Sequence, residues 1–396
     1  MSRLWDKGAP LDQRVLQYTA GEDYGLDERL VPYDVHASIA HAQMLRDQQL
    51  LNPADCAALC TALAEIGAAH ARGEWHITLA DEDGQTALES QLTARIGAAG
   101  GRIHLGRSRN DQVLTALRLY LRDAIGELDA AALRVAAALD DLAARQGGVA
   151  LPGYTHMQQA MPSSVALWAG AYAAEVRDDA RGIKSVLRRV QKNPLGSAAG
   201  YGAQGLPLDR DATTRALAFD LTQEPVTAVQ LSRGKAESQL LFETTLLMQD
   251  LGRLAADLLL FYTQEFAFVE LPESFTTGSS IMPQKRNPDV FELVRGRSAS
   301  AQASLLEALA ITAKLPSGYQ RDLQLLKFPL FRGIDIAMQT LDIMATGIGA
   351  LRFRADRIRL DPALHAAGEA YALVLKEGIP FREAYQRIGK RYMRKE

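Results

Sequence analysis

Apolar residues recur in the middle of the chain at alternating steps of three and four. The longest such run contains Leu114, Leu117, Leu121, Ala124, Leu128, Ala131, Val135, Ala138 and Leu142. This period places one apolar stripe along a single face of a helix. Asn110 and Asp111 are candidate N-cap residues, and the glycine pair at 147–148 offers a stop. The pattern therefore predicts one long helix between these points.

Four further segments have the same helical period: residues 163–190, 240–261, 289–313 and 332–351. Each is roughly 20 residues or longer, which exceeds the average length of a globular helix. Helices of this length usually bury their apolar stripes against one another in a bundle. The sequence has no convincing strand alternation, internal repeat or low-complexity segment. The predicted fold class is therefore all-α, a long-helix bundle whose apolar surface extends into oligomer contacts.

The connectors between these helices are long and rich in glycine, proline and polar residues. They cover residues 151–164, 193–211, 270–289 and 314–329. Connectors of this length often carry function. Shorter helices precede residue 110, and a small helical end follows residue 351. We therefore expect an N-terminal helical domain over 1–109, a central long-helix bundle over 110–351 and a short C-terminal helical domain over 352–396.

Composition narrows the class of protein. The 396 residues are 47% apolar and 23% charged, and the formal net charge is −3. This balance is typical of a globular protein and argues against non-specific binding to nucleic acid or an anionic membrane. No apolar stretch reaches the roughly 18 residues of a membrane span. The start, MSRLWDKGAP, also lacks the layout of a secretion signal.

Cysteine and histidine usage favours a cytoplasmic protein without a metal. Cys56 and Cys60 lie four residues apart in a helical segment, so we expect reduced core thiols rather than a disulfide. The seven histidines are scattered, and no pair has a recognisable metal-ligand spacing. No phosphate-cradling motif supports a pyridoxal group on a lysine. We therefore expect neither a metal nor a cofactor.

The segment before the first long helix suits an anion. Ser108, Arg109 and Asn110 follow a further arginine in GRIHLGRSRNDQ. Free backbone N–H groups at a helix start, together with arginine, favour a bound carboxylate. Helix capping with solvated charge explains the same residues, so both interpretations stay open at this point.

Two other connectors carry groups that could serve chemistry. Thr155 and His156 stand in a loop of glycine and proline, where a histidine can move protons at neutral pH. Tyr319, Gln324 and Lys327 offer a hydroxyl, an amide and a cation in SGYQRDLQLLK. A histidine without a role and a solvated turn are the alternatives for these two connectors.

The connector TTGSSIMPQKRNPD, residues 276–289, is the least like a simple linker. Asn287 and the proline after it are interpreted as the N-cap and first residue of the next helix, and Glu292 falls in its first turns. Helix capping does not explain Ser279 or Lys285, which suit a carboxylate-bearing substrate. Together the four connectors favour a small carboxylate substrate and acid–base chemistry.

At this point the motifs are specific enough to resemble a known family. GSSIMPQKRNP is similar to the G-S-S-x-M-P-x-K-x-N-P signature of the fumarase/aspartase superfamily of lyases. GGRIHLGRSRNDQ, LPGYTHMQQAMP and KLPSGYQRDLQ resemble the argininosuccinate lyases within it. The segments DVHASIAHAQML and GIPFREAYQRIGK are also similar, so the resemblance covers nearly the whole chain.

The resemblance implies a fold and an activity. The fold would be an all-helical homotetramer with a twenty-helix core, with each active site assembled from three subunits. The reaction would be the reversible β-elimination of argininosuccinate to arginine and fumarate, in arginine biosynthesis, without a cofactor. A lyase acting on another succinyl substrate and a non-enzymatic, crystallin-like helical oligomer are the alternatives.

The resemblance also implies a role for each matching residue. Ser279 would remove the Cβ proton of the succinyl part, and Lys285 would favour its alkoxide and stabilise the aci-carboxylate. His156, paired with Glu292 of another subunit, would support general-acid delivery to the leaving nitrogen. The residues matching substrate-binding positions are Ser108, Arg109, Asn110, Thr155, Asn287, Tyr319, Gln324 and Lys327.

The sequence departs from the family pattern at several places. Gln85 stands where a histidine is common, and Asp23 where many members have a serine that contacts substrate. An aspartate there could meet a cationic part of the substrate. Residues 232–235, Ser-Arg-Gly-Lys, replace the commoner Ser-Asp-Arg-Asp. We also expect an abbreviated C-terminal domain, because most members continue well beyond the position of Glu396.

Overall fold

The computed structural model describes residues 12–392, which divide into two compact units. Unit 1 comprises the described residues of the ranges Met1–Leu128, Gly182–Thr244 and Ala301–Asp335, and unit 2 comprises those of Asp129–Arg181, Thr245–Ser300 and Ile336–Glu396. The start of the chain, for which no secretion signal is expected, lies outside the described residues. Across residues 12–392, none of the helices combines the length and apolarity that a membrane span requires. The division into three domains stays a prediction.

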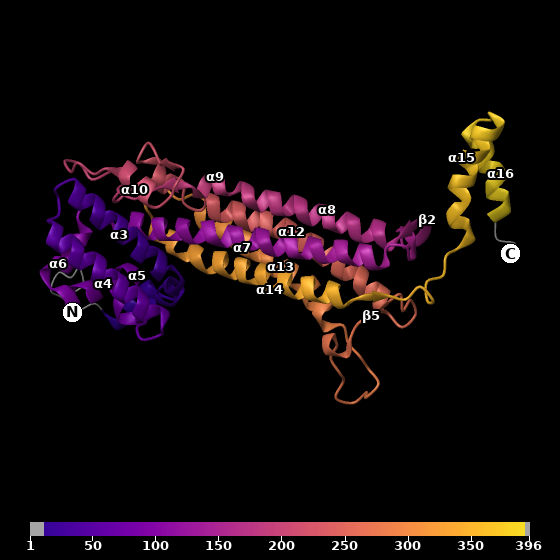
Figure 1. Ribbon diagram of the computed structural model, residues 1–396, viewed down its shortest axis with the longest axis horizontal. Coiled ribbons are helices and arrows are strands. Elements are labelled where there is room, and N and C mark those ends of the chain that lie inside the picture. The colour runs from indigo at the N-terminus through magenta and orange to yellow at the C-terminus, as the bar shows by residue number, and fades with distance from the viewer. Residues whose placement is uncertain (1–11, 393–396) are drawn as a thin grey trace. The chain divides into compact units, whose positions relative to one another are not determined.

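The long helices predicted from the periodicity are confirmed, although several ends shift. They are α7 (Arg109–Gln146), α8 (Val165–Ser185) with its short continuation α9 (Leu187–Val190), α12 (Lys235–Tyr262), α13 (Asp289–Thr312) and α14 (Lys327–Ala350). Within each unit, segments of these helices run side by side (Figure 1). The apolar stripe predicted for α7 is buried, except for the half-buried Ala138. In unit 1, α14 approaches so closely at Gly333 that a side chain there would collide with Leu241 of α12.

Unit 1 also contains the short helices of the N-terminal third. The helices here are α1 (Gln13–Ala20), α2 (Asp23–Leu26), η1 (Asp27–Leu30), α3 (Val31–Asp47), α4 (Pro53–Ala71), η2 (Leu79–Asp81), α5 (Gly84–Ile96), α6 (Ala98–Gly101) and η3 (Arg102–His104). Helices α3, α4 and α5 share one apolar core, which includes Leu45, Leu63 and Leu92. Helix α4 begins after the N-cap Asn52, whose side chain accepts a hydrogen bond from the Asp55 N–H at 2.8 Å. Cys56 lies in this core as a free thiol, as expected.

The rest of unit 1 is built around the long connectors. Residues 193–211 lead into α10 (Arg210–Ala216), and β3 (Lys192–Asn193) pairs in parallel with β4 (Leu221–Thr222). Helix α11 (Ala228–Leu231) precedes α12, and η5 (Arg321–Leu326) leads directly into α14. At the η5–α14 junction, a polar connector residue therefore becomes the first residue of a long helix.

Although the sequence has no convincing strand alternation, unit 2 contains a strand pair, so the expectation of a chain without strands is wrong. Strands β1 (Ala150–Thr155) and β2 (Gln158–Ser164) pair antiparallel as a hairpin. His156 and Met157 form its two-residue turn, with φ values of 54° and 61°. Two consecutive left-handed residues match the turn that the twist of a hairpin favours. The strand pattern escapes notice because Pro152, Gly153 and Pro162 interrupt it.

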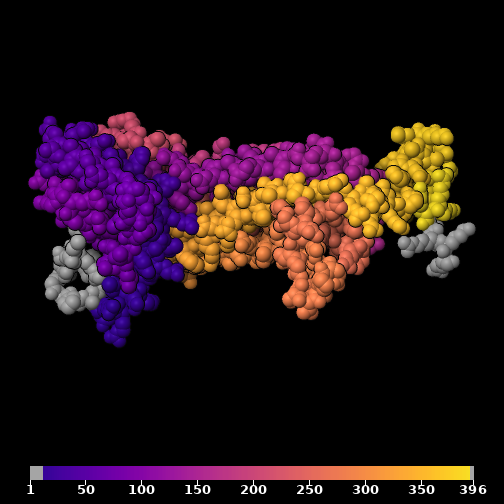
Figure 2. All heavy atoms as spheres, turned by 60° about the horizontal axis from the view of Figure 1, so that its bottom comes forward, coloured from indigo at the N-terminus to yellow at the C-terminus, as the bar shows by residue number. Residues whose placement is uncertain are grey.

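Unit 2 ends in a small helical hairpin. Helix α15 (Ala366–Glu377), preceded by η6 (Pro362–His365), packs on α16 (Phe381–Tyr392) through Ala370, Ala384 and Ile388. The short pair of β5 (Val269–Glu270) and β6 (Arg352–Phe353) lies before the connector to α13. That connector includes η4 (Glu273–Phe275) and projects away from the helices of its own unit (Figures 1 and 2).

Candidate active site

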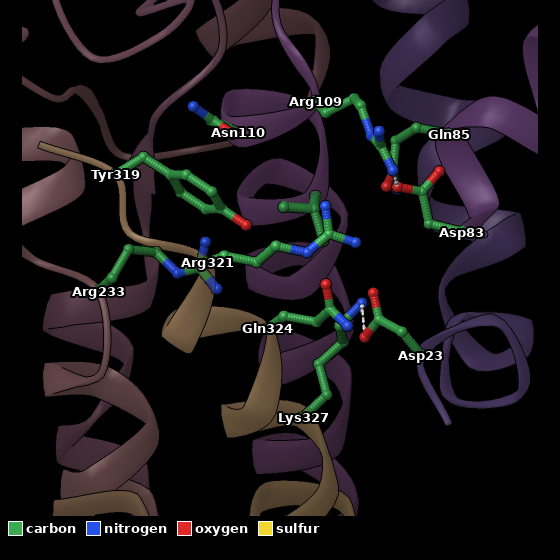
Figure 3. A pocket seen from close by; sticks show the side chains of 11 residues that line it. Asp23, Asp83, Gln85, Arg109, Asn110, Arg233, Tyr319, Arg321, Gln324 and Lys327 are labelled. Carbon is green, nitrogen blue, oxygen red and sulfur yellow. Dashed lines mark hydrogen bonds and ion pairs between the residues drawn. The ribbon is translucent and has the colours of Figure 1, made fainter. Parts of the chain in front are cut away.

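Unit 1 contains a polar cavity of about 230 Å³. Its wall brings together the start of α2, the start of α5, the first turn of α7, the segment just before α12 and the η5–α14 junction (Figure 3). The lining residues are Asp23, Asp83, Gln85, Arg109, Asn110, Val113, Arg233, Tyr319, Arg321, Gln324 and Lys327. Five residues predicted to bind substrate, Arg109, Asn110, Tyr319, Gln324 and Lys327, therefore line one cavity, which the sequence could not show.

Lys327 is the buried cation of this cavity. It is the first residue of α14 and is 2% exposed. Its Nζ lies 2.7 Å from Asp23 Oδ1 and 2.5 Å from Asp27 Oδ1. Burial opposes its charge, but the two carboxylates raise the pKa of Lys327 above its usual value. The lysine is therefore a fixed positive charge held by two acids.

Arg109 is held in place by the cap of another helix. Asp83 is the N-cap of α5, and its Oδ1 accepts from the Thr86 N–H at 2.8 Å. Its other oxygen pairs with the Arg109 guanidinium, and Glu82 lies 3.8 Å from the same arginine. Although burial opposes the charge, these carboxylates raise the pKa of Arg109. One aspartate thus joins the start of α5 to the start of α7.

The start of α7 corrects the predicted cap. Asn110 and Asp111 lie inside the first turn, so neither is the N-cap. Ser108 occupies that position: its Oγ accepts from the Asn110 N–H at 3.4 Å, and its own N–H donates to Asp111 Oδ1 at 2.8 Å. Ser108 does not line the cavity, and its side-chain and N–H contacts here are to the first turn of α7. Burial raises the pKa of Asp111 to about 6, although backbone N–H groups, including that of Ala198, stabilise its charge.

A buried polar network lies behind the cavity wall. Gln85 donates to Asp34 Oδ2 at 3.1 Å, Ser38 donates to Asp34 Oδ1 at 3.2 Å, and Arg107 donates to Ser38 Oγ at 2.8 Å. Burial raises the pKa of Asp34 and lowers that of Arg107. The amide of Gln85 therefore has a structural partner in this protein, which gives a physical reason for glutamine at this position.

Sequence reasoning missed several residues of the site. Asp27 and Asp83 are ordinary acids near short helices, and no local pattern marks them as partners of distant cations. Arg321 and Arg233 also line the cavity. Arg233 is 5% exposed and donates from Nη2 to the Leu323 carbonyl at 3.2 Å. The departure of residues 232–235, Ser-Arg-Gly-Lys, from the family pattern was the feature of the sequence that could have marked Arg233 as a site residue.

The other predicted residues belong to unit 2 and do not line this cavity. Thr155 and His156 are exposed at the tip of the β1–β2 hairpin. Lys285 and Glu292 are exposed, and Ser279 is half-buried. Among the described residues, no hydrogen bond or ion pair links these five side chains to one another. One chain alone therefore does not assemble the predicted catalytic set through direct contacts.

The connector that carries Ser279 has its own internal order. Ser279 Oγ accepts from the N–H of Met282 at 3.2 Å. The backbones of Thr277 and Asn287 pair, with N–O distances of 3.0 and 2.8 Å, which closes the base of the loop. The predicted cap is again wrong by one residue: α13 begins at Asp289, and the Asn287 amide instead donates to the Gly278 carbonyl at 3.3 Å.

Comparison with known proteins places this geometry in a family. The family described as "Lyase" matches residues 12–303. A protein of Sorangium cellulosum named argininosuccinate lyase is 46% identical over 98% of this chain and 90% of its own length. Relatives of the same name in Xylella fastidiosa and Thermotoga neapolitana are 41% and 38% identical, covering 98% and 99% of this chain and 87% and 98% of theirs.

Solved structures agree at the level of the fold. An EDDS lyase in complex with formate has a TM-score of 0.79 and 25% identity, over 96% of this chain and 76% of that chain. A fumarate lyase, described as delta crystallin, from Brucella melitensis has a TM-score of 0.75 at 18% identity, over 92% of this chain and 84% of that chain. The second likeness concerns the fold alone. With relatives this similar over nearly its whole length, the chain belongs to the argininosuccinate lyase family.

Proposed function

We propose that this protein cleaves argininosuccinate reversibly to arginine and fumarate, as a cytoplasmic carbon–nitrogen lyase of arginine biosynthesis. The observation that carries the proposal is the 38–46% identity to argininosuccinate lyases over 98–99% of the chain. The cavity of unit 1 supports it, because positively charged arginine and lysine side chains and negatively charged aspartates line the same polar cavity. A substrate that bears carboxylates, an ammonium and a guanidinium requires such a mixture.

Proton removal is assigned to the loop that projects from unit 2. Ser279 takes the Cβ proton of the succinyl part, and the resulting charge moves onto the neighbouring carboxylate. Lys285 and Asn287 stabilise that aci-carboxylate electrostatically. A serine is a weak base, so its alkoxide needs the cation of Lys285 nearby. The exposed position of this loop leaves it free to close over substrate.

The leaving nitrogen needs a proton from the opposite side. His156, oriented by Glu292 of another subunit, supports that general-acid step. Thr155 lies next to it on the hairpin and binds substrate, as do Ser108, Arg109, Asn110, Tyr319, Gln324 and Lys327. Products are arginine, which gains the proton, and fumarate, which gains the double bond.

We further propose a homotetramer with a twenty-helix core, in which three subunits contribute to each active site. Large apolar side chains along the long helices stay exposed in the single chain and would be buried by partner subunits. They are Leu133 of α7, Leu167 of α8, Phe242 and Leu246 of α12, and Leu293, Leu306 and Leu309 of α13. Shared sites explain why His156 and Glu292 are exposed and unconnected within one chain.

The test is the release of fumarate from argininosuccinate, followed by its ultraviolet absorbance. Ser279→Ala should lower turnover by about 10²- to 10⁴-fold, the range for loss of a positioned proton acceptor, with substrate binding and oligomer size unchanged. Ser280→Ala removes the adjacent hydroxyl and serves as the matched control, which should stay active. An active Ser279→Ala enzyme, or a larger loss of turnover in the Ser280→Ala control, would mean that a residue other than Ser279 is the base.

A second candidate function is cleavage of a different succinyl adduct. The observations that favour it are Asp23 and Gln85 in the cavity wall and the likeness to EDDS lyase. The same absorbance assay separates the two candidates. Fumarate release from another succinyl amine, with none from argininosuccinate, would select the second. A folded oligomer that releases fumarate from neither would instead match the crystallin-like alternative.

A further inference from the structure

The cavity carries one more acid than its buried lysine can neutralise. Lys327 pairs with both Asp23 and Asp27. Asp27 is fully buried, and its second oxygen accepts from the Gly84 N–H at 3.0 Å. Asp27 and Lys327 therefore form a complete pair inside the fold. Asp23 is the surplus negative charge, and it is the one of the two acids that lines the cavity.

We infer that Asp23 binds a positively charged group of the arginyl end of the substrate. The inference rests on the proposed function, because it names the residue that selects a cationic over a neutral ligand.

Asp23 shares its close counter-charge, Lys327, with Asp27. The arginines of the wall have carboxylates of their own: Arg109 pairs with Asp83, and Arg233 lies 3.7 Å from Glu237. Arg321 donates to the Thr19 carbonyl at 2.9 Å. Within the described chain, Lys327 is the cation that forms an ion pair with Asp23. The titratable or charged groups around it are Asp27 of η1, Asp83 before α5, Arg109 of α7, Arg233 before α12, Tyr319 before η5, Arg321 of η5 and Lys327 of α14.

Burial and the charges around Asp23 determine the pH at which its carboxyl loses its proton. Burial raises the pKa of Asp23 to about 7, against the attraction of Lys327, and the like charges of Asp27 and Asp83 add to the rise. The carboxyl is therefore mostly neutral at pH 6 and mostly ionised at pH 8. A cationic ligand binds the ionised form, so it must displace a proton at low pH. The affinity should be about tenfold weaker at pH 6 than at pH 8.

The experiment is calorimetric titration of the whole protein with L-arginine at pH 6 and pH 8. The wild-type protein should show the tenfold change, and at pH 6 it should release a proton on binding, seen as a dependence of the heat on buffer ionisation. Asp23→Asn should bind arginine roughly ten- to a hundredfold more weakly at pH 8, because a charge-assisted bond is lost. It should also lose the dependence on pH.

The matched control is Asp322→Asn, which removes the same charge from an exposed position on η5 outside the cavity. It should leave the affinity and its pH dependence unchanged. Lys327 keeps Asp27 as a partner when Asp23 is replaced, so the variant should fold. Asp23→Ser is the second variant if Asp23→Asn fails to give a cooperative thermal transition.

Two arginine analogues identify the group that Asp23 binds. L-citrulline lacks the guanidinium charge, and Nα-acetyl-L-arginine lacks the α-ammonium. The analogue whose affinity does not change on Asp23→Asn is the one without the recognised cation. Equal loss for both analogues, or for neither, would overturn the inference. So would undetectable arginine binding to the wild-type protein, or an unchanged pH dependence in Asp23→Asn.

These outcomes are separate from those of the proposed function. Fumarate release without Asp23-dependent arginine binding would support the lyase and reject this inference. Arginine binding that depends on Asp23, without fumarate release, would support the inference and reject the lyase.

Discussion

At the scale of single residues, burial decides which groups can change charge. His41 of α3 is fully buried, and its Nε2 lies 2.8 Å from the Leu105 carbonyl oxygen. A carbonyl only accepts, so Nε2 carries a proton. Burial lowers the pKa of His41 to about 3, and the nearby charge of Arg107 adds to the effect.

This histidine predicts a loss of stability in acid. The unfolded chain binds a proton at His41 below about pH 6.5, whereas the folded protein does not until about pH 3. Stability from this residue is therefore complete at neutral pH and falls as the pH drops from 6.5 towards 3. The contribution lost by pH 5 is about 2 kcal/mol.

The test compares urea unfolding of the wild-type protein and His41→Gln at pH 7 and pH 5. Glutamine can still donate to the Leu105 carbonyl but does not titrate. The wild-type protein should lose about 2 kcal/mol more than the variant over this interval. Parallel losses would show that His41 does not stay neutral in the fold. Asp23 and Asp111 act in the opposite direction, because their raised pKa values add stability in acid, and both proteins share that contribution.

At the scale of elements, the site is built where helices begin. Helix α5 begins at the cap formed by Asp83, α7 begins beside Ser108, and α14 begins with Lys327 itself. A helix start leaves backbone N–H groups to be satisfied, and side chains that satisfy them become fixed in space. The cavity uses these fixed side chains to hold its charges.

Asp83 caps helix α5 and also pairs with Arg109, and two substitutions separate these two roles. Asp83→Asn keeps an oxygen for the Thr86 N–H but removes the charge that holds Arg109, so KM for argininosuccinate should rise. Asp83→Ala also removes the cap and should unfold at lower urea, with about 1 kcal/mol less stability than Asp83→Asn.

The control for this pair is Asn52→Ala, which removes the cap of α4 away from the cavity. It should lose a similar amount of stability with KM unchanged. Equal stability of the two Asp83 variants would mean that the carboxylate does not cap α5 in solution. An unchanged KM in both would mean that Arg109 does not need its partner to bind substrate.

At the scale of the whole molecule, the predicted catalytic residues are distributed over surfaces that one chain leaves open. His156 lies on the hairpin turn, and Lys285 lies on the connector before α13. If each active site takes these two residues from different subunits, inactive His156→Asn and Lys285→Ala proteins should complement one another. Random mixing in equal amounts leaves about one site in four with both native residues.

The measurement is fumarate release after the two variants are unfolded together and refolded. Recovery of up to about a quarter of wild-type activity is expected, against none for either variant refolded alone. Mass measurement of differently tagged subunits confirms that mixed oligomers have formed. Mixed oligomers without activity would contradict sites shared between subunits.

Much of this protein follows from local sequence. The alternation of three and four apolar steps predicts α7, α8, α12, α13 and α14, because a helical stripe is a property of neighbouring residues. The specificity of the GSSIMPQKRNP motif likewise identifies the superfamily from eleven adjacent letters. Where local rules failed, the error was also local: the caps of α7 and α13 were displaced by one to three residues, and prolines interrupted the strand pattern of the hairpin.

The cavity depends on the tertiary structure. Lys327 meets Asp27 across 300 positions of the chain, and Arg109 meets Asp83 across 26. No periodic pattern encodes such pairs, because each side chain also satisfies the rules of its own helix start. Packing alone determines which acid shares which cation, which acid is left over, and how far burial shifts their pKa values. The residues were therefore available from the sequence, whereas their partnership, including the surplus charge at Asp23, was decided by the fold.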